Sequence, residues 1–159
     1  MRRKDKEITE FTEIEALIRR APVCRIGLSD EGQPYVVPMN FGYRDRSLYL
    51  HSAPEGRKIA ILRKNHRVCF EVDLDYELIG SETACRFSAD YSSVIGFGRA
   101  FLLEDPEEKR QGLNVIMEHY TGVESHQYSE RHLEAVAVIR VEIDSITGKR
   151  SQRRGTGGQ

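Results

Sequence analysis

Two alternating runs and a helix start lie in residues 34–58, PYVVPMNFGYRDRSLYLHSAPEGRK. Apolar side chains occupy every second position from residue 35 to residue 43, and residues 47–51 repeat the pattern after a polar turn. A period of two is typical of a strand with one buried face. Pro38 cannot donate to a neighbouring strand, so it belongs at a sheet edge or a bulge. The segment therefore predicts two strands joined by a turn.

Four more strands follow the same pattern outside this segment. Together the predicted strands cover residues 23–28, 34–43, 47–51, 68–73, 91–103 and 135–143. Gly96 and Gly98 interrupt the longest strand, which predicts a bend or the close approach of another backbone. Residues 74–90 are polar and lack a clear period, so we expect a long loop there.

Helices are inserted between the strands without alternating regularly with them. They are predicted over residues 11–18, 54–64, 105–120 and 130–134. Thr12 and Glu15 form a capping box at the first helix, and Asn65 is a left-handed stop for the second. The order of elements predicts a mainly β (α+β) fold, a six-stranded antiparallel barrel with flanking helices. A doubly wound parallel sheet would need a helix after nearly every strand.

Length and charge narrow the classes of protein to consider. The chain has 159 residues, so we expect a single domain over 1–150 and a disordered tail over 151–159. Lys and Arg (24) nearly balance Asp and Glu (25), so no net field attracts nucleic acid or an anionic membrane. The basic N-terminus is followed by polar residues and not by an apolar signal segment, which favours a cytoplasmic protein.

The cysteines favour neither disulfides nor a metal site. Cys24, Cys69 and Cys85 are odd in number and widely spaced, which predicts buried thiols. No pair has CxxC spacing, and His51 and His66 lie apart from all three. We therefore expect no metal centre.

The predicted helix after the second of the two opening strands begins with two adjacent cations, Arg57 and Lys58. A helix N-terminus offers unpaired N–H groups and a partial positive charge, and neighbouring cations add charge-assisted contacts with oxygen. This point of the chain can therefore bind a phosphate. Surface Arg-Lys pairs are, however, usually solvated, and the pattern alone leaves both interpretations open.

Four motifs taken together resemble one known family. They are YVVPMN at 35–40, YLHSAPEGRK at 49–58, YSSVIGFGRA at 91–100 and ITGK at 146–149. Over nearly its whole length the chain resembles the pyridoxamine 5′-phosphate oxidase-like family of FMN-binding split barrels, and within it the nitroimidazole-resistance branch. The resemblance implies a split barrel, bound FMN, and a homodimer that holds FMN at the subunit interface.

The resemblance also implies a set of cofactor contacts. They are Val37, Pro38, Met39, Asn40, Leu50, His51, Ser52, Arg57 and Lys58, with Ser93 from the long strand. Two features depart from the oxidases themselves. Tyr35 stands where they carry a basic residue, and residues after Ser151 do not match the segment that binds their vitamin substrate. Pyridoxamine-phosphate oxidase activity is therefore not expected.

His51 is the candidate residue for chemistry. Imidazole exchanges protons near neutral pH, so His51 at a flavin rim can pass a proton during substrate reduction, or it can simply hydrogen-bond the flavin. The resemblance supports the first role, because resistance proteins have a functional histidine at the matching position. The remaining histidines are expected at the surface: His66, His119, His126 and His132.

The barrel itself predicts a second copy of the chain. A barrel of this size is filled by side chains, so a flavin must lie on an outer face that something else covers. Ile95, Phe97 and Phe101 on the longest strand form an apolar patch that suits a two-fold interface.

Three functions remain open from the sequence. The first is an FMN-dependent oxidoreductase, a reductase of a small aromatic or nitroaromatic compound. The second is a non-catalytic flavin- or haem-binding protein for storage, sensing or haem handling, in which His51 can ligate the iron. The third is a partner protein with an empty pocket. An absorption spectrum separates them, since flavin and haem absorb in different bands.

Overall fold

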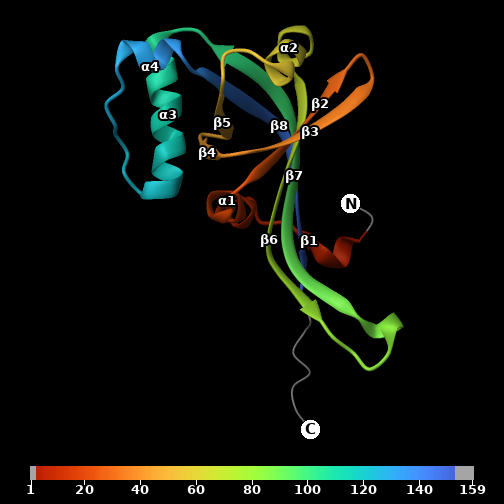
Figure 1. The fold of residues 1–159 in the computed structure, drawn as a ribbon. Helices are drawn as coiled ribbons and strands as arrows, with labels where there is room; N and C mark the ends of the chain where they lie inside the picture. Colours follow the sequence, from red (N-terminus) through yellow and green to blue (C-terminus); the bar gives the residue numbers. More distant parts are fainter. Residues whose placement is uncertain (1–2, 153–159) are drawn as a thin grey trace.

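One antiparallel sheet forms the body of the molecule in a computed structural model that describes residues 3–152 (Figure 1). Its strands are β1 (Glu7–Ile8), β2 (Cys24–Asp30), β3 (Gln33–Met39), β4 (Phe41–Arg44), β5 (Ser47–Ser52), β6 (Arg67–Ile79), β7 (Ser88–Leu103) and β8 (Ala137–Ser151). The helices are α1 (Phe11–Arg20), α2 (Arg57–Lys64), α3 (Pro106–Thr121) and α4 (Glu130–Glu134), with 3₁₀ turns at Lys4–Lys6 and Ala84–Arg86. The mainly β, antiparallel class predicted from the sequence is confirmed.

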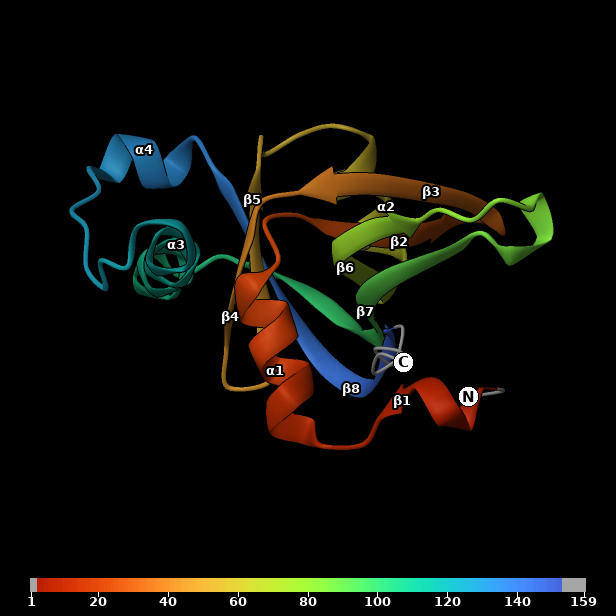
Figure 2. The same cartoon turned by 90° about the horizontal axis from the view of Figure 1, so that it is seen from below.

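The sheet closes into a split barrel at a single residue. Its strand order is β3-β2-β6-β7-β8-β5-β4, so β3 and β4 lie at opposite ends of the sheet. These two strands are consecutive in the chain, and only Asn40 separates them. The sheet therefore curls until its two ends meet at Asn40 (Figure 2).

Alternate strand residues and one face of α1 fill the barrel. Phe41, Leu50 and Phe70 are fully buried, and Leu17 and Ile18 of α1 join them. Each such side chain contributes roughly 1.5–3 kcal/mol through removal of apolar surface from water. The interior of the barrel is therefore occupied by side chains, as the sequence predicts.

The two glycines of β7 allow close contacts that a side chain would block. A Cβ at Gly96 would lie 2.3 Å from the ring of Phe70, and one at Gly98 would lie 2.2 Å from the carbonyl oxygen of Glu142. The pairing of β7 with β8 shifts register between Phe97 and Gly98. The predicted close approach at these glycines is confirmed.

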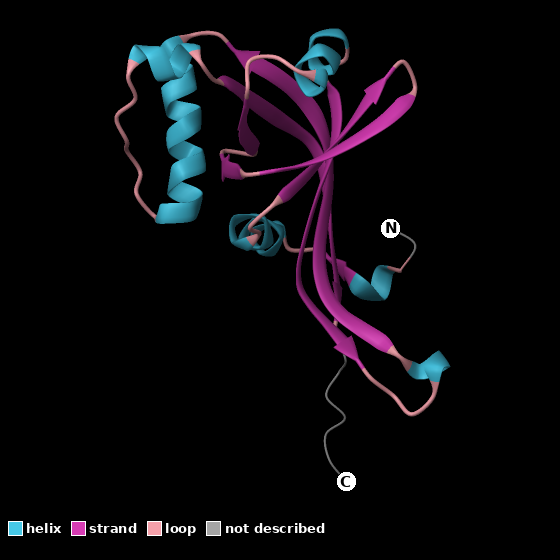
Figure 3. Cartoon of the chain, in the orientation of Figure 1, coloured by secondary structure: helices cyan, strands magenta, loops and turns pink. Residues whose placement is uncertain are grey.

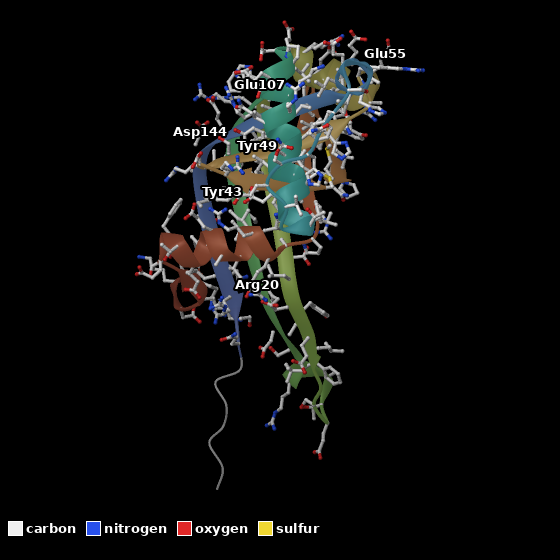
Figure 4. The ribbon with its side chains drawn as sticks, turned by 90° about the vertical axis from the view of Figure 1, so that its left-hand side faces the viewer. Arg20, Tyr43, Tyr49, Glu55, Glu107 and Asp144 are labelled. Carbon is white, nitrogen blue, oxygen red and sulfur yellow. The ribbon has the colours of Figure 1, made fainter. Side chains whose placement is uncertain are left out.

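Helix α3 packs against the outer side of β4 and β5. Its N-terminus is capped by Asp105, whose Oδ1 accepts hydrogen bonds from the N–H groups of Glu107 (2.9 Å) and Glu108 (3.0 Å). Tyr49 of β5, labelled in Figure 4, lies against this helix at Gly112. The helix predicted over residues 105–120 is confirmed.

The predicted count of six strands is wrong, because the described residues form eight. Asn40 divides the single strand predicted over 34–43 into β3 and β4, and β1 adds a short strand beside β8, with Glu7 opposite Lys149. The break at Asn40 is invisible in the sequence because apolar residues keep alternating through it.

Residues 74–90 form most of a hairpin arm and not the predicted loop. Strand β6 continues to Ile79, β7 already begins at Ser88, and both project beyond the barrel (Figure 3). Solvent reaches both faces of this two-stranded arm, so its sequence lacks the apolar-polar alternation of a half-buried strand.

Three local predictions are also wrong. No side chain caps α1, whose N-cap residue is Glu10, so Thr12 and Glu15 do not form a capping box. Asn65 has φ −140°, which is extended and not left-handed. Cys85 is exposed, unlike the buried thiol expected there.

The last strand runs further than the sequence predicts. It continues past residue 143 to Ser151, the first residue of the predicted tail, which is 6% exposed and accepts a hydrogen bond from Lys6. The tail prediction from residue 153 onward lies outside the described residues. Within residues 3–152, no helix is long and apolar enough to span a membrane.

Candidate functional site

A shallow, open pocket of about 370 Å³ lies where the two ends of the sheet meet. It is lined by Pro38, Met39, Asn40, His51, Ser52, Ala53 and Lys58. These residues come from the end of β3, the end of β5 with the following residue, and the start of α2. The break at Asn40 therefore creates the pocket, and the ends of two strands and one helix supply its walls.

The register of β3 turns part of its backbone towards this pocket. The hairpin from β2 to β3 has a two-residue turn, Glu31 and Gly32, with φ values of 52° and 91°. Such a turn is closed by a hydrogen-bonded pair, and hydrogen-bonded pairs then alternate along the strands. By this count Val36 and Pro38 direct their backbone groups away from β2, towards the free edge. The carbonyl of Pro38 is thus available beside the pocket.

Lys58 is the charged residue of the pocket. Its side chain is half-buried, and burial lowers the pKa of its ammonium group. No hydrogen bond or ion pair involves this side chain among the described residues. It also stands in the first turn of α2, whose N-cap Gly56 supplies no side-chain hydrogen bond. An unpaired cation therefore lies next to unsatisfied N–H groups.

Arg57 is held apart from Lys58. Its guanidinium carbon lies 4.7 Å from the centroid of the Tyr35 ring, and Arg57 does not line the pocket. A guanidinium over an aromatic face is attracted by roughly 0.5–1 kcal/mol at an exposed site. Tyr35, which stands where the oxidases carry a basic residue, thus holds Arg57, one of the two predicted phosphate ligands.

His51 and Ser52 line the pocket from the end of β5. His51 is exposed, lines the pocket and has no hydrogen-bonding partner among the described residues. The hydroxyl of Ser52 donates to the carbonyl of Ala53 at 2.8 Å. Pairing of β5 with β8, with His51 opposite Val138, fixes both positions. A free imidazole therefore faces the same space as Lys58.

Besides Arg57, three more of the predicted contacts lie outside the pocket. The side chain of Leu50 is 1% exposed and belongs to the core, so only its backbone could reach a ligand. Val37 is half-buried and packs against the same core. Ser93 lies on β7, three strand spacings from β3, which is roughly 14 Å at about 4.8 Å per spacing.

The C-terminal end of α3 holds the two sides of the split together. The hydroxyl of Tyr120 accepts from the N–H of Phe41 at 3.1 Å and donates to the carbonyl of Pro22 at 2.9 Å. His119 Nε2 lies 2.8 Å from the carbonyl oxygen of Ala21, and its ring centroid lies 4.6 Å from that of Phe41. Phe41 directly follows Asn40 of the pocket.

Nothing in the sequence predicts these contacts of His119 and Tyr120, which we call the clamp. The prediction of a surface position is wrong for His119 and His126, which are partly buried. Tyr120 could be assigned only to the apolar stripe of its helix, because its hydrogen bonds join segments about eighty to a hundred residues apart. Ala53 of the pocket was missed as well, because it carries no chemical group that a motif would single out.

An outer face that combines exposed apolar side chains with the ion pairs of Arg25 to Glu71 and Asp73 begins at the pocket and crosses the sheet. Register places Val36, Gly27, Cys69 and Phe97 in one row across β3, β2, β6 and β7. The next row holds Pro38, Arg25, Glu71 and Ile95. Val36 is 62% exposed, Phe97 56% and Ile95 43%. Because Pro38 belongs to both the pocket and this outer face, the two are continuous.

The sequence matches the family model of pyridoxamine 5′-phosphate oxidase over residues 10–150. The chain belongs to the pyridoxamine 5′-phosphate oxidase family. A candidate 5-nitroimidazole antibiotic resistance protein from Bacteroides thetaiotaomicron has a similar structure, with 42% identity and a TM-score of 0.81 over 91% of this chain and 86% of its own. The family predicted from the four motifs is confirmed.

More distant members of the pyridoxamine 5′-phosphate oxidase fold are similar over most of the chain. A flavocytochrome from Azotobacter vinelandii has a TM-score of 0.84 and 23% identity over 96% of this chain and 72% of its own. An FAD and haem binding protein from Mycobacterium smegmatis has a TM-score of 0.83 and 19% identity over 93% and 74%. They show the shared split-barrel fold. No protein with curated function matches closely enough to add to this comparison.

Proposed function

We propose that the chain binds FMN in the pocket at the barrel split and reduces a small aromatic or nitroaromatic compound. The observation that carries the proposal is Lys58, an unpaired, half-buried cation in the first turn of a helix without a side-chain cap. Such a point favours an anion with several oxygen atoms, and the phosphate of FMN has that chemistry. Membership of the oxidase family and the similarity to the candidate resistance protein agree with it.

The residues present fit a flavin mononucleotide in kind and arrangement. Lys58, the first N–H groups of α2 and the hydroxyl of Ser52 would hold the phosphate. Arg57 would add a second cation on leaving the ring of Tyr35. The carbonyl of Pro38 and the amide of Asn40 would meet the polar edge of the isoalloxazine.

His51 would serve the reaction as a proton donor. FMN, when bound, supplies electrons for reduction of the substrate. Reduction of a nitro group consumes protons, and an exposed imidazole on the pocket wall can hold one at either ring nitrogen and deliver it. Neighbouring groups do not compete for this imidazole, since it has no hydrogen-bonding partner among the described residues.

A homodimer would complete this site. The pocket is shallow and opens onto the outer face, so a cofactor in it would stay partly exposed in one chain. A second copy packed on the outer face would cover the cofactor and bury Phe97 and Ile95. It would also bring its own outward-facing Ser93 towards the pocket, which the Ser93 of the same chain does not line. A two-fold interface of this kind is the commonest form of oligomer.

The alternative is a flavin- or haem-binding protein without turnover. It is favoured by the free imidazole of His51, which suits an iron ligand as well as a proton donor. Two structural neighbours are a flavocytochrome and an FAD and haem binding protein by name.

The cytoplasmic location expected from the N-terminal sequence stays a prediction, which cell fractionation would test.

Titration of purified protein with FMN, followed by flavin fluorescence, tests the proposal. We expect quenching with saturable binding, and loss of affinity in the double variant Arg57→Ala, Lys58→Ala. Lys64→Ala is the matched control, because Lys64 lies at the other end of α2 and is 3.9 Å from Glu31. Turnover of a nitroaromatic panel with NADH and NADPH separates the reductase from the alternative. Equal affinity of the double variant and the wild type would place the phosphate elsewhere.

A further inference from the structure

The exposed side chain of Arg57 is held by the ring of Tyr35. The guanidinium carbon lies 4.7 Å from the ring centroid, and no hydrogen bond or ion pair involves this side chain among the described residues. An exposed contact of this kind is weak, so a stronger ligand for the guanidinium can displace the ring. The position of Arg57 therefore depends on what else is within its reach.

Tyr35 and the helix that carries Arg57 are both anchored to β2. Tyr35 pairs with Leu28 of β2, is half-buried and packs against the core of the barrel. At the other end of α2, the side-chain amide of Asn65 donates to the carbonyl of Ser29 in β2 at 3.1 Å. Neither the ring nor the helix is free to move away, so Arg57 leaves the ring by rotation of its own side chain.

The contact with Tyr35 keeps one of two adjacent cations out of the empty pocket. Lys58 lines the pocket without a partner, whereas Arg57 does not line it. Two like charges close together destabilise each other when no anion lies between them. A phosphate beside Lys58 reverses this preference, because a guanidinium binds phosphate more strongly than it binds an exposed aromatic face.

We propose that Tyr35 is a positioning residue, which holds Arg57 away from the empty pocket until the phosphate of a flavin draws Arg57 off the ring. The inference rests on the proposed binding of FMN in the pocket. Tyr35 does not line the pocket, so it acts through Arg57 and not on the flavin itself. Because phosphate binding breaks the contact, Tyr35 lowers the affinity for FMN. It leaves unchanged the affinity for riboflavin, which has the same ring system without the phosphate.

Fluorescence titrations of the full-length chain with FMN and with riboflavin test the proposal. Tyr35→Leu removes the aromatic face, and Tyr35→Phe is the control that keeps it. We expect Tyr35→Leu to lower the Kd for FMN about 2- to 5-fold, the loss of one exposed cation–π contact, and to change the Kd for riboflavin less than twofold. Tyr35→Phe should match the wild type with both ligands. An unchanged or higher Kd for FMN in Tyr35→Leu, or an equal change for both flavins, would overturn the proposal.

A double-mutant cycle shows whether the effect passes through Arg57. In the Arg57→Ala background, Tyr35→Leu should no longer change the Kd for FMN. The same change in both backgrounds would overturn the role of Tyr35 and leave FMN binding in place. Absence of FMN binding to the wild type would instead overturn the proposed function, and this inference with it.

Proton NMR of the unmodified protein gives a second test that needs no substitution. Protons over the face of an aromatic ring are shifted upfield by the ring current, so the Cδ protons of Arg57 should show this shift in the free protein. They should lose the shift on addition of FMN and keep it on addition of riboflavin. The same response to both flavins, or no shift in the free protein, would contradict the proposed displacement of Arg57 by phosphate.

Discussion

The barrel end of the sheet and the β6–β7 arm are built from the same antiparallel ladder, but they differ in what covers their faces. In the barrel, Phe41 is 0% and Leu50 1% exposed, because one side of every strand faces a filled interior. In the arm, Tyr76 and Leu78 are 67% and 59% exposed, and neither side meets another layer within the chain. The barrel therefore has a buried layer of its own, whereas the described residues of the arm have none and are tied to the barrel by the ion pair of Asp75 with Arg20.

The difference also explains where the candidate site lies. The pocket lies at Asn40, where the chain passes from β3 to β4. The ends of barrel strands therefore hold the polar groups of the pocket. Its open side faces the same outer surface that continues into the arm. The barrel thus positions the residues of the pocket, and in the proposed homodimer the uncovered surface would close over them.

The largest effect on the free energy of unfolding should come from Gly42→Ala, which adds a single methyl group to β4 in the barrel. A Cβ at Gly42 would lie 2.3 Å from the carbonyl oxygen of Val115, a backbone atom that cannot move aside. Gly42→Ala should lower the free energy of unfolding by about 3 kcal/mol in a urea titration. Gly80→Ala in the arm is the control, since nothing lies within 4 Å of its Cβ, and it should change the free energy by less than about 0.5 kcal/mol. A similar fall in the free energy of unfolding for both variants would contradict the difference in packing between the barrel and the arm.

The next largest effect should be on FMN affinity and its pH dependence, both of which we expect to depend on Lys58. Lys58→Ala should weaken FMN binding roughly 10- to 100-fold near neutral pH, through loss of a charge-assisted contact of about 1.5–3 kcal/mol. Because burial lowers the pKa of Lys58, the free protein loses this proton at a lower pH than an exposed lysine would. Phosphate favours the charged form, so FMN affinity should fall as pH rises through this range.

Lys58→Arg is the control for that pH dependence, because a guanidinium stays protonated throughout. Fluorescence titrations from neutral pH up to the pH at which an exposed lysine loses its proton should show a decline in affinity for the wild type and a flatter profile for the arginine variant. Parallel profiles would assign the decline to another group.

A smaller effect is expected from the clamp behind the split. Tyr120→Phe removes the hydroxyl that joins the N–H of Phe41 to the carbonyl of Pro22, and should lower the free energy of unfolding by about 1–2 kcal/mol. Tyr128→Phe is a matched control, because the buried hydroxyl of Tyr128 has no hydrogen-bonding partner among the described residues. Its removal should be neutral or slightly stabilising. Calorimetry or urea unfolding of both variants decides whether the clamp contributes.

The smallest effect on stability should come from His51. Its side chain is exposed and makes no hydrogen bond among the described residues, so His51→Ala should shift the free energy of unfolding by less than about 0.5 kcal/mol. Nitroaromatic reduction should fall while FMN remains bound. Loss of folded protein would instead make His51 a structural residue.

The sequence predicts the barrel end better than the arm, for a physical reason. Strands with one buried side alternate visibly, so β2, β5 and most of β7 could be located from residues such as Ile26, Leu48 and Val94. The arm has no buried side and therefore no period. The pairing of β6 with β7 shifts register between Leu74 and Glu77, which makes a β-bulge at Asp75. This bulge depends on pairing with β7 and on the ion pair of Asp75 with Arg20, neither of which is local in sequence.

The sequence predicts only those features of the site that lie within a single motif. Pro38, His51 and Lys58 stand in motifs that resemble a known family, and the structure brings these three to one pocket. The separation of Arg57 from Lys58 depends on the position of Tyr35 in another strand. No pattern within one segment could have indicated it.

The central claim is that two chains enclose FMN between a barrel pocket and an outer face. Light scattering of the FMN-loaded protein at micromolar concentration tests it most directly. We expect the mass of two 18.2 kDa chains with one FMN per chain, and a single-chain mass with FMN lost when Phe97→Glu splits the dimer. A mass of one 18.2 kDa chain with FMN still bound would contradict the account.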